Sequence, residues 1–421
     1  MSAELETSLA LVYVARDSSI PKAFGAWNDN IAIGGQIGPV RILIAPDKFK
    51  GALNSREIAE NIAKGLRDSL PEVRIDIVPM ADGGEGTAEA ICEARGGLWL
   101  KCKAHDPIGR EIEARYAWIN DGRLAVMEMS EAAGMRRLSK AERDPVRATT
   151  FGVGEMMLDA AKREPNEIIL GLGGSATNDG GFGMARALGY RFFSEGNVLT
   201  DGVSELAKLT KIKLSVAAGL SPANSTAQPT WLPRQLKIIA AVDVQNPLLG
   251  ENGATCVFGP QKGASKNELN LLEQSLTRLA DVIATEFDHD DRDKPGAGAA
   301  GGLGFGLMSF CNATIRPGFD VVAEAVGLEA KMKDSDLVIT GEGSLDRQTL
   351  EGKTPAGVAR LARKLRKPVF AIVGRATSDP EVRKIFDRVY ENARPEMSEQ
   401  ENMKRAAELL RENARELTKN L

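Results

Sequence analysis

Residues 41–55 read RILIAPDKFKGALNS, and this stretch sets a pattern that the rest of the chain repeats. After Arg41 its first residues are apolar and partly β-branched, which predicts a short buried strand over 41–45. A polar loop follows, and Asn54 with Glu57 three residues later is typical of a capping box at the start of a helix. The predicted helix has one apolar face, formed by Ile58, Ile62 and Leu66.

The same order of strand and polar loop recurs along the chain. The next strand is expected over 73–77, leading into PMADGGEGT and a helix over 87–95. Four later stretches repeat the order: EIILGLGGSATNDGG (167–181), KIIAAVDVQNP (237–247), DLVITGEGSLDRQT (336–349) and PVFAIVG (368–374). Alternating strands and helices indicate an α/β fold with parallel sheets covered on both faces, and ligands then bind beyond the carboxyl ends of the strands. Many of the 43 glycines fall in these loops.

The domain organisation follows from a change in this pattern. From about residue 96 to 295 the order is less regular, with strand-like EARYAWI and RLAVMEM and a helical stretch over 267–287. We interpret this segment as a second α/β domain inserted into the first, and the amphipathic C-terminus as a docking helix rather than a partner-binding helix. The expected parts are a poorly ordered extension (1–40), a discontinuous first domain (41–95 and 296–395), the inserted domain (96–295) and the docking helix (396–421).

Charge and composition exclude several classes of function. The net charge is −4, no long basic run occurs and no window of about 18 apolar residues exists, which excludes nucleic acid and membrane as main partners. Glu4 and Glu6 stand where a signal peptide would be basic, so a cytoplasmic enzyme is expected. The four cysteines lack CxxC spacing and only two histidines occur, which does not favour zinc sites, disulfides or His-dependent hydrolysis.

Two patterns resemble nucleotide-binding loops. Lys353 in LEGKT resembles a P-loop lysine, but Arg347 stands where that motif requires glycine. GAGAAG (296–301) matches G-x-G-x-x-G, with Asp320 about twenty residues later, but it follows DHDDRDKP rather than a strand. We therefore favour a glycine-rich helix start over an NAD site, and phosphate binding at that helix start stays open.

Polar residues that follow the predicted strands are the candidate site residues. The loop over 171–181 offers hydroxyls, an amide and a carboxylate that suit a small oxygen-rich substrate, although Asn-Asp-Gly is also ordinary turn chemistry. Carboxylates beside lysines at strand ends are what Mg-nucleotide chemistry requires, although each alone could cap a helix or lie in solvent. The residues concerned are Asp47, Lys48, Lys50, Asp82, Glu85, Asp243, Glu342, Asp346 and Arg347.

Six motifs, taken in order, closely resemble those of the bacterial-type glycerate kinase family. They are IAPDKFKGALNS, MADGGEGT, GLGGSATNDGG, DVQNPLLGENGA with VFGPQKGA, GAGAAGGLG and VITGEGSLDRQTLEGKTPAGVA. The resemblance implies a flavodoxin-like parallel-sheet domain interrupted by a second α/β domain, with the active site in the cleft between them. It also implies the reaction of ATP with D-glycerate, with Mg2+, to give ADP and 2-phosphoglycerate. Residues 1–40 are additional to the family pattern, and the contact of Arg375 in VGRATSD with a ligand is left open.

Roles for individual residues follow as a hypothesis. Asp179 would accept the hydroxyl proton, with Asp346 able to exchange roles with it, and Lys50 would neutralise the transferring phosphoryl group or the substrate carboxylate. Substrate contacts are assigned to Lys48, Asp82, Ser175, Thr177 and Asn178, and Mg2+ ligands to Asp243 and Glu342. ATP contacts are assigned to Gly173, Gly174, Gly298, Gly301, Gly341, Gly343 and Lys353.

Alternative functions stay open at this point. The motifs favour phosphoryl transfer more strongly than they define the acceptor, so a kinase of another small hydroxy acid or sugar acid is the nearest alternative, as is 3-phosphoglycerate as product. An NAD-dependent hydroxy-acid dehydrogenase would rest on GAGAAG, and a non-catalytic binding protein on the fold alone. The expected partners are D-glycerate and ATP, and a homodimer is left open.

Overall fold

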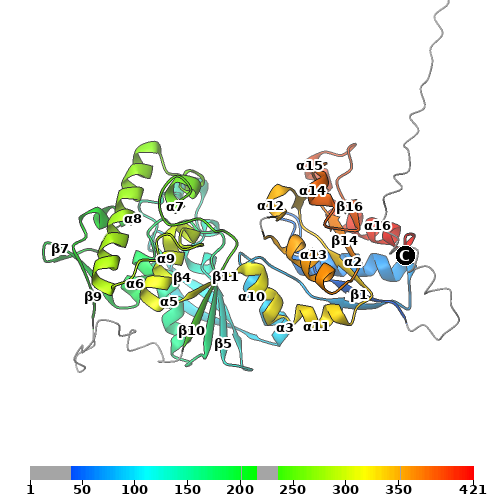
Figure 1. Cartoon of the computed structure of the whole chain (residues 1–421), viewed down its shortest axis with the longest axis horizontal. Helices are drawn as coiled ribbons and strands as arrows, with labels where there is room; N and C mark the ends of the chain where they lie inside the picture. Colours follow the sequence, from blue (N-terminus) through cyan, green and yellow to red (C-terminus); the bar gives the residue numbers. More distant parts are fainter. Residues whose placement is uncertain (1–38, 201, 216–235, 351) are drawn as a thin grey trace, which may run out of the picture.

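The computed structural model describes residues 39–200, 202–215, 236–350 and 352–421. Residues 1–38, most of the expected extension, lie outside the described part. Two α/β lobes lie side by side, one built on a five-stranded sheet and the other on a six-stranded sheet (Figure 1). No helix in these ranges combines the length and apolar character needed to cross a membrane.

The five-stranded sheet has the flavodoxin-like order. Its strands run parallel in the order β16-β14-β12-β1-β2, which is 5-4-3-1-2 when they are numbered along the chain. Strand order reverses between β1 and β12, and ligands bind at such a switch point in open α/β sheets. The strands are β1 (Arg41–Ile44), β2 (Arg74–Ile77), β12 (Leu337–Thr340), β14 (Val369–Val373) and β16 (Arg388–Glu391). The predicted fold class is confirmed.

Helices cover both faces of this sheet. On one face α2 (Ser55–Ser69) and α16 (Ala406–Thr418) bury their apolar stripes together against β1, β12 and β14. The stripe of α16 includes Leu410, Ala414 and Leu417, all fully buried. The expected docking segment (396–421) thus forms the short α15 (Glu399–Lys404) and then α16, which packs on the first sheet. The other face is covered by α13 (Thr354–Lys364) and α10 (Gly318–Ala325).

The capping box of α2 is formed as predicted. The Asn54 side chain accepts a hydrogen bond from the Glu57 amide at 2.8 Å, and the Glu57 carboxylate accepts one from the Asn54 amide at 2.8 Å. We expect Asn54→Ala to lower the free energy of unfolding by about 1 kcal/mol, since one amide at the helix start loses its acceptor. Urea unfolding followed by circular dichroism measures this. Asn54→Ser, which keeps a capping oxygen, is the control, and equal unfolding midpoints for Asn54→Ala and wild type would contradict the prediction.

The second sheet contains six strands in the order β11-β10-β6-β5-β4-β3. Its β5, β6, β10 and β11 run parallel, whereas β4 is antiparallel to both of its neighbours. The strands are β3 (Leu98–His105), β4 (Glu111–Ile119), β5 (Leu124–Glu128), β6 (Glu167–Gly171), β10 (Lys237–Val242) and β11 (Thr314–Pro317). On the side away from the first sheet, four helices pack against this sheet and form a hydrophobic core with it, here called the outer core. They are α5 (Phe151–Ala161), α6 (Phe182–Ala187), α8 (Lys266–Phe287) and α9 (Ala299–Cys311). A small sheet of β7 (Tyr190–Ser194), β8 (Asn197–Val198) and β9 (Lys211–Leu214) adjoins them.

The chain returns to the first sheet later than expected. We expected residues 296–317 in the first domain, but α9 packs in the outer core of the second and β11 pairs with β10 through Ile239 and Thr314. The glycine-rich segment before β11 has no hydrophobic periodicity from which this strand pairing could be predicted. We therefore propose that the inserted domain ends near Pro317.

The two sheets share one hydrophobic core. Leu43 and Val338 of the first sheet belong to the same buried cluster as Val126 and Ile239 of the second, with Phe319 of α10 between them. Figure 1 shows α10 and α3 (Thr87–Arg95) at the junction of the two lobes, and α11 (Leu328–Lys333) at the lower edge of the first lobe. The shorter elements are α4 (Ser130–Ala133), α7 (Ala254–Phe258), α12 (Arg347–Leu350), α14 (Pro380–Arg383), β13 (Ser344–Leu345) and β15 (Arg375–Ala376).

A buried carboxylate links the second sheet to α3. Glu128, the last residue of β5, accepts hydrogen bonds from the amides of Gly86 and Ala88 at 2.9 and 3.1 Å. It thus supplies the cap that α3 lacks within its own segment, since Gly86 at the cap position has no side chain. This link holds the loop over 82–86 against the carboxyl ends of the second sheet.

Candidate active site

Carboxylates from the strand ends of both sheets meet at the cleft between the lobes. Asp47 follows β1, Asp82 follows β2, and Glu342 follows β12 at the switch point of the first sheet. Asp243 follows β10 of the second sheet, and its carboxyl group lies close enough to that of Asp82 for Asp82 to raise its pKa. Acidic groups that follow strands of both sheets are therefore the candidate site.

The environment raises the pKa of these carboxyl groups. Burial raises the pKa of Asp243 to about 9, and the neighbouring charges of Asp82 and Asp47 add to this effect. Burial and the charge of Asp82 raise the pKa of Asp47 to about 6, although Thr354 donates a hydrogen bond to it at 2.9 Å. Burial also raises the pKa of Glu342 to about 7. Crowded carboxyl groups of this kind favour a bound proton or cation and are typical of functional sites.

These shifts predict how stability depends on pH in the metal-free protein. Asp47 and Glu342 hold protons up to about pH 6 and 7 when folded, whereas their ordinary values are 3.8 and 4.5. The folded state therefore binds more protons between these values, and the free energy of unfolding falls as pH rises through this range. We expect the melting temperature in EDTA to fall from pH 5 to pH 8, and less steeply for Glu342→Gln. Glu72→Gln, an exposed carboxyl, is the control, and an unchanged slope for Glu342→Gln would contradict the assignment.

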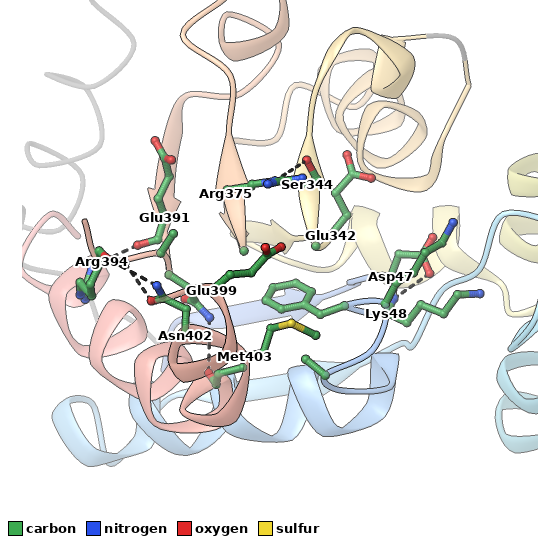
Figure 2. Close-up of a pocket in the computed structure, with 18 of the residues that line it drawn as sticks. Asp47, Lys48, Glu342, Ser344, Arg375, Glu391, Arg394, Glu399, Asn402 and Met403 are labelled. Carbon is green, nitrogen blue, oxygen red and sulfur yellow. Dashed lines mark hydrogen bonds between the residues drawn. The ribbon is translucent and has the colours of Figure 1, made fainter. Parts of the chain in front are cut away.

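A cavity of about 700 Å3 extends from this cluster across the strand ends of the first sheet. In Figure 2, Asp47 and Lys48 lie at one end of it and Glu391 and Arg394 at the other. Phe49, Met397 and Met403 offer apolar surface, which suits a nucleotide base. Its cations suit phosphate groups, and they are Lys48, Lys50, Lys353, Arg375 and Arg394. Arg375, left open from the sequence, thus lines the cavity beside Ser344, whose hydroxyl lies 3.3 Å from its Nε.

A second cavity of about 170 Å3 lies on the other side of the Asp82–Asp243 contact. Of the residues expected to bind substrate or cofactor, Gly173, Gly174 and Ser175 line it. Asp243 and Lys262 also line it. Asp82 lines the larger cavity and the adjacent Gly83 lines the smaller one, so the two cavities are neighbours, as transfer between two ligands requires.

Asp179 occupies a structural position. Only 1% of it is exposed, and its carboxylate accepts hydrogen bonds from the Thr150 amide at 2.8 Å, the Thr150 hydroxyl at 2.9 Å and the Gly183 amide at 3.1 Å. The Gly181 amide donates a further bond at 3.2 Å. Burial raises the pKa of Asp179, and these bonds oppose the rise. Because its oxygens are occupied at the start of α6 and it lines none of the cavities described above, this geometry does not favour the base role expected of it.

Several other expected site residues also pack rather than face a cavity. Thr177 and Asn178 are fully buried, and the Asn178 amide group donates to the Thr255 hydroxyl at 3.0 Å. Gly301 has a φ of +70°, and a Cβ there would collide with the Thr177 carbonyl. A Cβ on Gly298 would likewise collide with the Pro247 carbonyl, and a Cβ on Gly341 with the Ile372 carbonyl. These glycines permit close backbone packing, whereas Gly343 and Lys353 do line the larger cavity.

Some residues of the site were not assigned from the sequence. Asp47 was noted in its motif without a role, and Lys262 lies in VFGPQKGA, where nothing local marks a lysine as buried. Asn392 and Asn402 line the far end of the larger cavity, after β16 and in α15. Their only sequence signal is their position after the last strand, and the alternation of RVYE is too short to mark that strand clearly.

The carboxylates fit a magnesium ion that is shared with a nucleotide. Within the described residues, no three carboxylate, histidine or cysteine side chains form a complete metal cage. Mg2+ is usually held by one or two carboxylates together with substrate phosphates and water, which matches Asp47 and Glu342 beside the cation-lined cavity. Asp346 lies 3.7 Å from Lys353, which pairs it with a lysine of the same cavity.

The fold and the comparisons that follow define an α/β phosphotransferase built of two lobes. Residues 42–421 match the glycerate kinase family, and the chain belongs to that family. It is an ATP-dependent kinase, as expected from the sequence motifs.

Known relatives agree in sequence and in structure. The glycerate kinase of Halalkalibacterium halodurans is 42% identical over 79% of this chain and 85% of its own length. The glycerate 2-kinase of Escherichia coli K12 is also 42% identical, over 81% of this chain and 86% of its own. A crystal structure from Salmonella typhimurium LT2, provisionally named glycerate kinase 2, is 39% identical, with a TM-score of 0.77 over 90% of this chain and 98% of that one.

Proposed function

We propose that the enzyme transfers the γ-phosphoryl group of ATP to the 2-hydroxyl of D-glycerate, giving 2-phosphoglycerate and ADP. The observation that carries this proposal is the contact of Asp82 with Asp243, where a nucleotide-sized cavity meets a small one. The name of the Escherichia coli relative, glycerate 2-kinase, supports the 2-hydroxyl as acceptor.

The larger cavity would hold ATP. Lys48, Lys50 and Lys353 would bind the phosphates, and Asp346 would orient Lys353. Asp47 and Glu342 would hold Mg2+. When bound, Mg2+ neutralises charge on the phosphate oxygens and relieves the repulsion between the carboxylates around it. In this proposal Asp243 is not a Mg2+ ligand, although the sequence analysis assigned it as one.

In the transfer step the 2-hydroxyl oxygen of glycerate forms a bond to the γ-phosphorus, and the bond from that phosphorus to the β–γ bridging oxygen breaks. ADP leaves with the electron pair of the broken bond, and the hydroxyl proton passes to a carboxylate. We assign this proton to Asp243, because Asp243 lines the small cavity and Asp179 does not. The pKa of Asp243 is high because of burial and its acidic neighbours. Mg2+ held by Asp47 and Glu342 would lower this pKa, and the ionised Asp243 could then accept the hydroxyl proton.

Product analysis tests the function. Purified enzyme with Mg-ATP and D-glycerate should release ADP in a coupled assay, and phosphorus NMR should show 2-phosphoglycerate. A signal of 3-phosphoglycerate would overturn the position of transfer. A higher kcat/KM for another hydroxy acid or sugar acid from a panel would overturn the acceptor. A cytoplasmic location and assembly as a homodimer stay predictions.

A further inference from the structure

The small cavity is built from segments that lie far apart in the chain. It lies between the glycine loop after β6, the end of β10, the turn η4 (Pro260–Lys262) and the start of α9. Its volume of about 170 Å3 is well below the roughly 300–1,000 Å3 of sites for drug-sized ligands. Met135, Leu172 and Phe258 close its apolar sides. A ligand here must be about as small as a three-carbon acid.

Lys262 places a buried ammonium group in the wall of this cavity. Only 3% of Lys262 is exposed, and its Nζ donates to the Thr177 carbonyl at 2.6 Å and lies 3.5 Å from the Ser175 hydroxyl. In the described part of the chain no carboxylate lies within 4.0 Å of this Nζ. An ammonium group has three donors, so it keeps the capacity to bind a further acceptor.

The charge of Lys262 is only partly balanced. Burial lowers its pKa to about 7, and the negative charge of Asp179 opposes this effect from a greater distance. The other ionisable group that lines the cavity is Asp243, whose pKa burial and its acidic neighbours raise to about 9. A buried cation without a direct counter-charge is costly, and an anion that enters the cavity supplies that charge.

We propose that the small cavity binds the acceptor acid and that Lys262 binds the carboxylate of that acid. This inference rests on the proposed function, and it adds a specificity-determining residue to it. With its carboxylate at Lys262 and Ser175, a three-carbon hydroxy acid can direct its 2-hydroxyl toward Asp243 at the cavity edge. Hydroxy compounds of similar size without a carboxylate are then rejected, because they leave the buried ammonium group unpaired.

A third cavity, of about 190 Å3, is a less suitable place for the acid. It lies between the start of α2, α3 and β3–β5, and it contains Arg115 and Arg136. Arg136 already pairs with Glu131 at 2.7 Å, and Lys48 donates to the Glu85 carbonyl. Carboxylates outnumber cations in its lining, so a further carboxylate would meet repulsion there.

Steady-state kinetics of Lys262→Met test the inference. A charged hydrogen bond contributes about 1.5–3 kcal/mol, so the KM for D-glycerate should rise about 10- to 100-fold. The KM for ATP should stay within threefold. In the wild type the KM for D-glycerate should rise about tenfold per pH unit above pH 7, because the free enzyme loses the Lys262 proton, and this rise should vanish in Lys262→Met.

Two control variants separate the outcomes. Leu269→Ala loosens the same turn from its outer side, where Leu269 packs beside Gly259, and it should leave the KM for D-glycerate within threefold. Arg136→Met should also leave the KM for D-glycerate within threefold, because we do not expect the third cavity to bind the acid. If Lys262→Met keeps the wild-type KM and pH profile, or if Arg136→Met alone raises the KM, the inference is wrong. Failure of the wild type to phosphorylate D-glycerate would instead overturn the proposed function.

Discussion

Asp243→Asn should lower kcat about a thousandfold while the KM values for ATP and D-glycerate change by less than fivefold. Removal of a general base costs about 10²- to 10⁴-fold in rate, and an asparagine of the same size keeps the shape of the small cavity. The substitution should not destabilise the free enzyme. Burial and acidic neighbours raise the pKa of Asp243 to about 9, so we expect the neutral form in the free enzyme at pH 7, and asparagine resembles that form.

The combination of lost turnover and retained stability distinguishes catalysis from a structural role. Steady-state kinetics and thermal melts of the same preparations measure both quantities. Asp293→Asn, an exposed aspartate on the second domain, is the control and should change neither. A kcat within tenfold of wild type would show that another group accepts the proton.

Asp179→Ala should lower the free energy of unfolding by about 3 kcal/mol or more. The alanine would leave the amides of Thr150, Gly181 and Gly183 and the Thr150 hydroxyl without their acceptor in a buried position. Each unsatisfied buried donor costs about 1–3 kcal/mol, and the sum is reduced because neighbouring effects are not additive. Urea unfolding followed by fluorescence or circular dichroism provides the measurement.

A milder change keeps this prediction testable if Asp179→Ala does not fold. Thr150→Val removes the hydroxyl that donates to Asp179 and accepts from the Met184 amide at 2.9 Å. It should lower the unfolding free energy by about 1–3 kcal/mol and leave kcat within threefold. If Asp179→Asn instead keeps wild-type stability and loses about a thousandfold in kcat, Asp179 is the base after all.

The sequence predicted the elements of the fold well. The capping box at Asn54 and Glu57, the helix over 87–95 and the strand before the glycine loop at 171 lie where their local patterns placed them. Such features depend on residues a few positions apart, through side-chain period, capping hydrogen bonds and backbone preference. The family could be recognised because the loop sequences are long motifs that resemble those of the family.

The site itself was predicted in part. Lys48, Lys50, Asp82, Glu342 and Lys353 line the larger cavity, as residues that follow parallel strands should. Asp179 was predicted to be catalytic because its loop is rich in polar residues, whereas its hydrogen bonds to Thr150 favour a structural role. Polar composition cannot distinguish a carboxylate that faces a ligand from one that caps a helix.

By itself the sequence determined the α/β class, the family and the loops that carry the chemistry. Only the tertiary structure decided that Asp82 lies beside Asp243, that Lys262 is buried in a cavity wall, and that β11 pairs with β10. The physical reason is range. Local structure follows from neighbours along the chain, whereas burial, counter-charges and pKa are set by groups that folding brings together from distant segments.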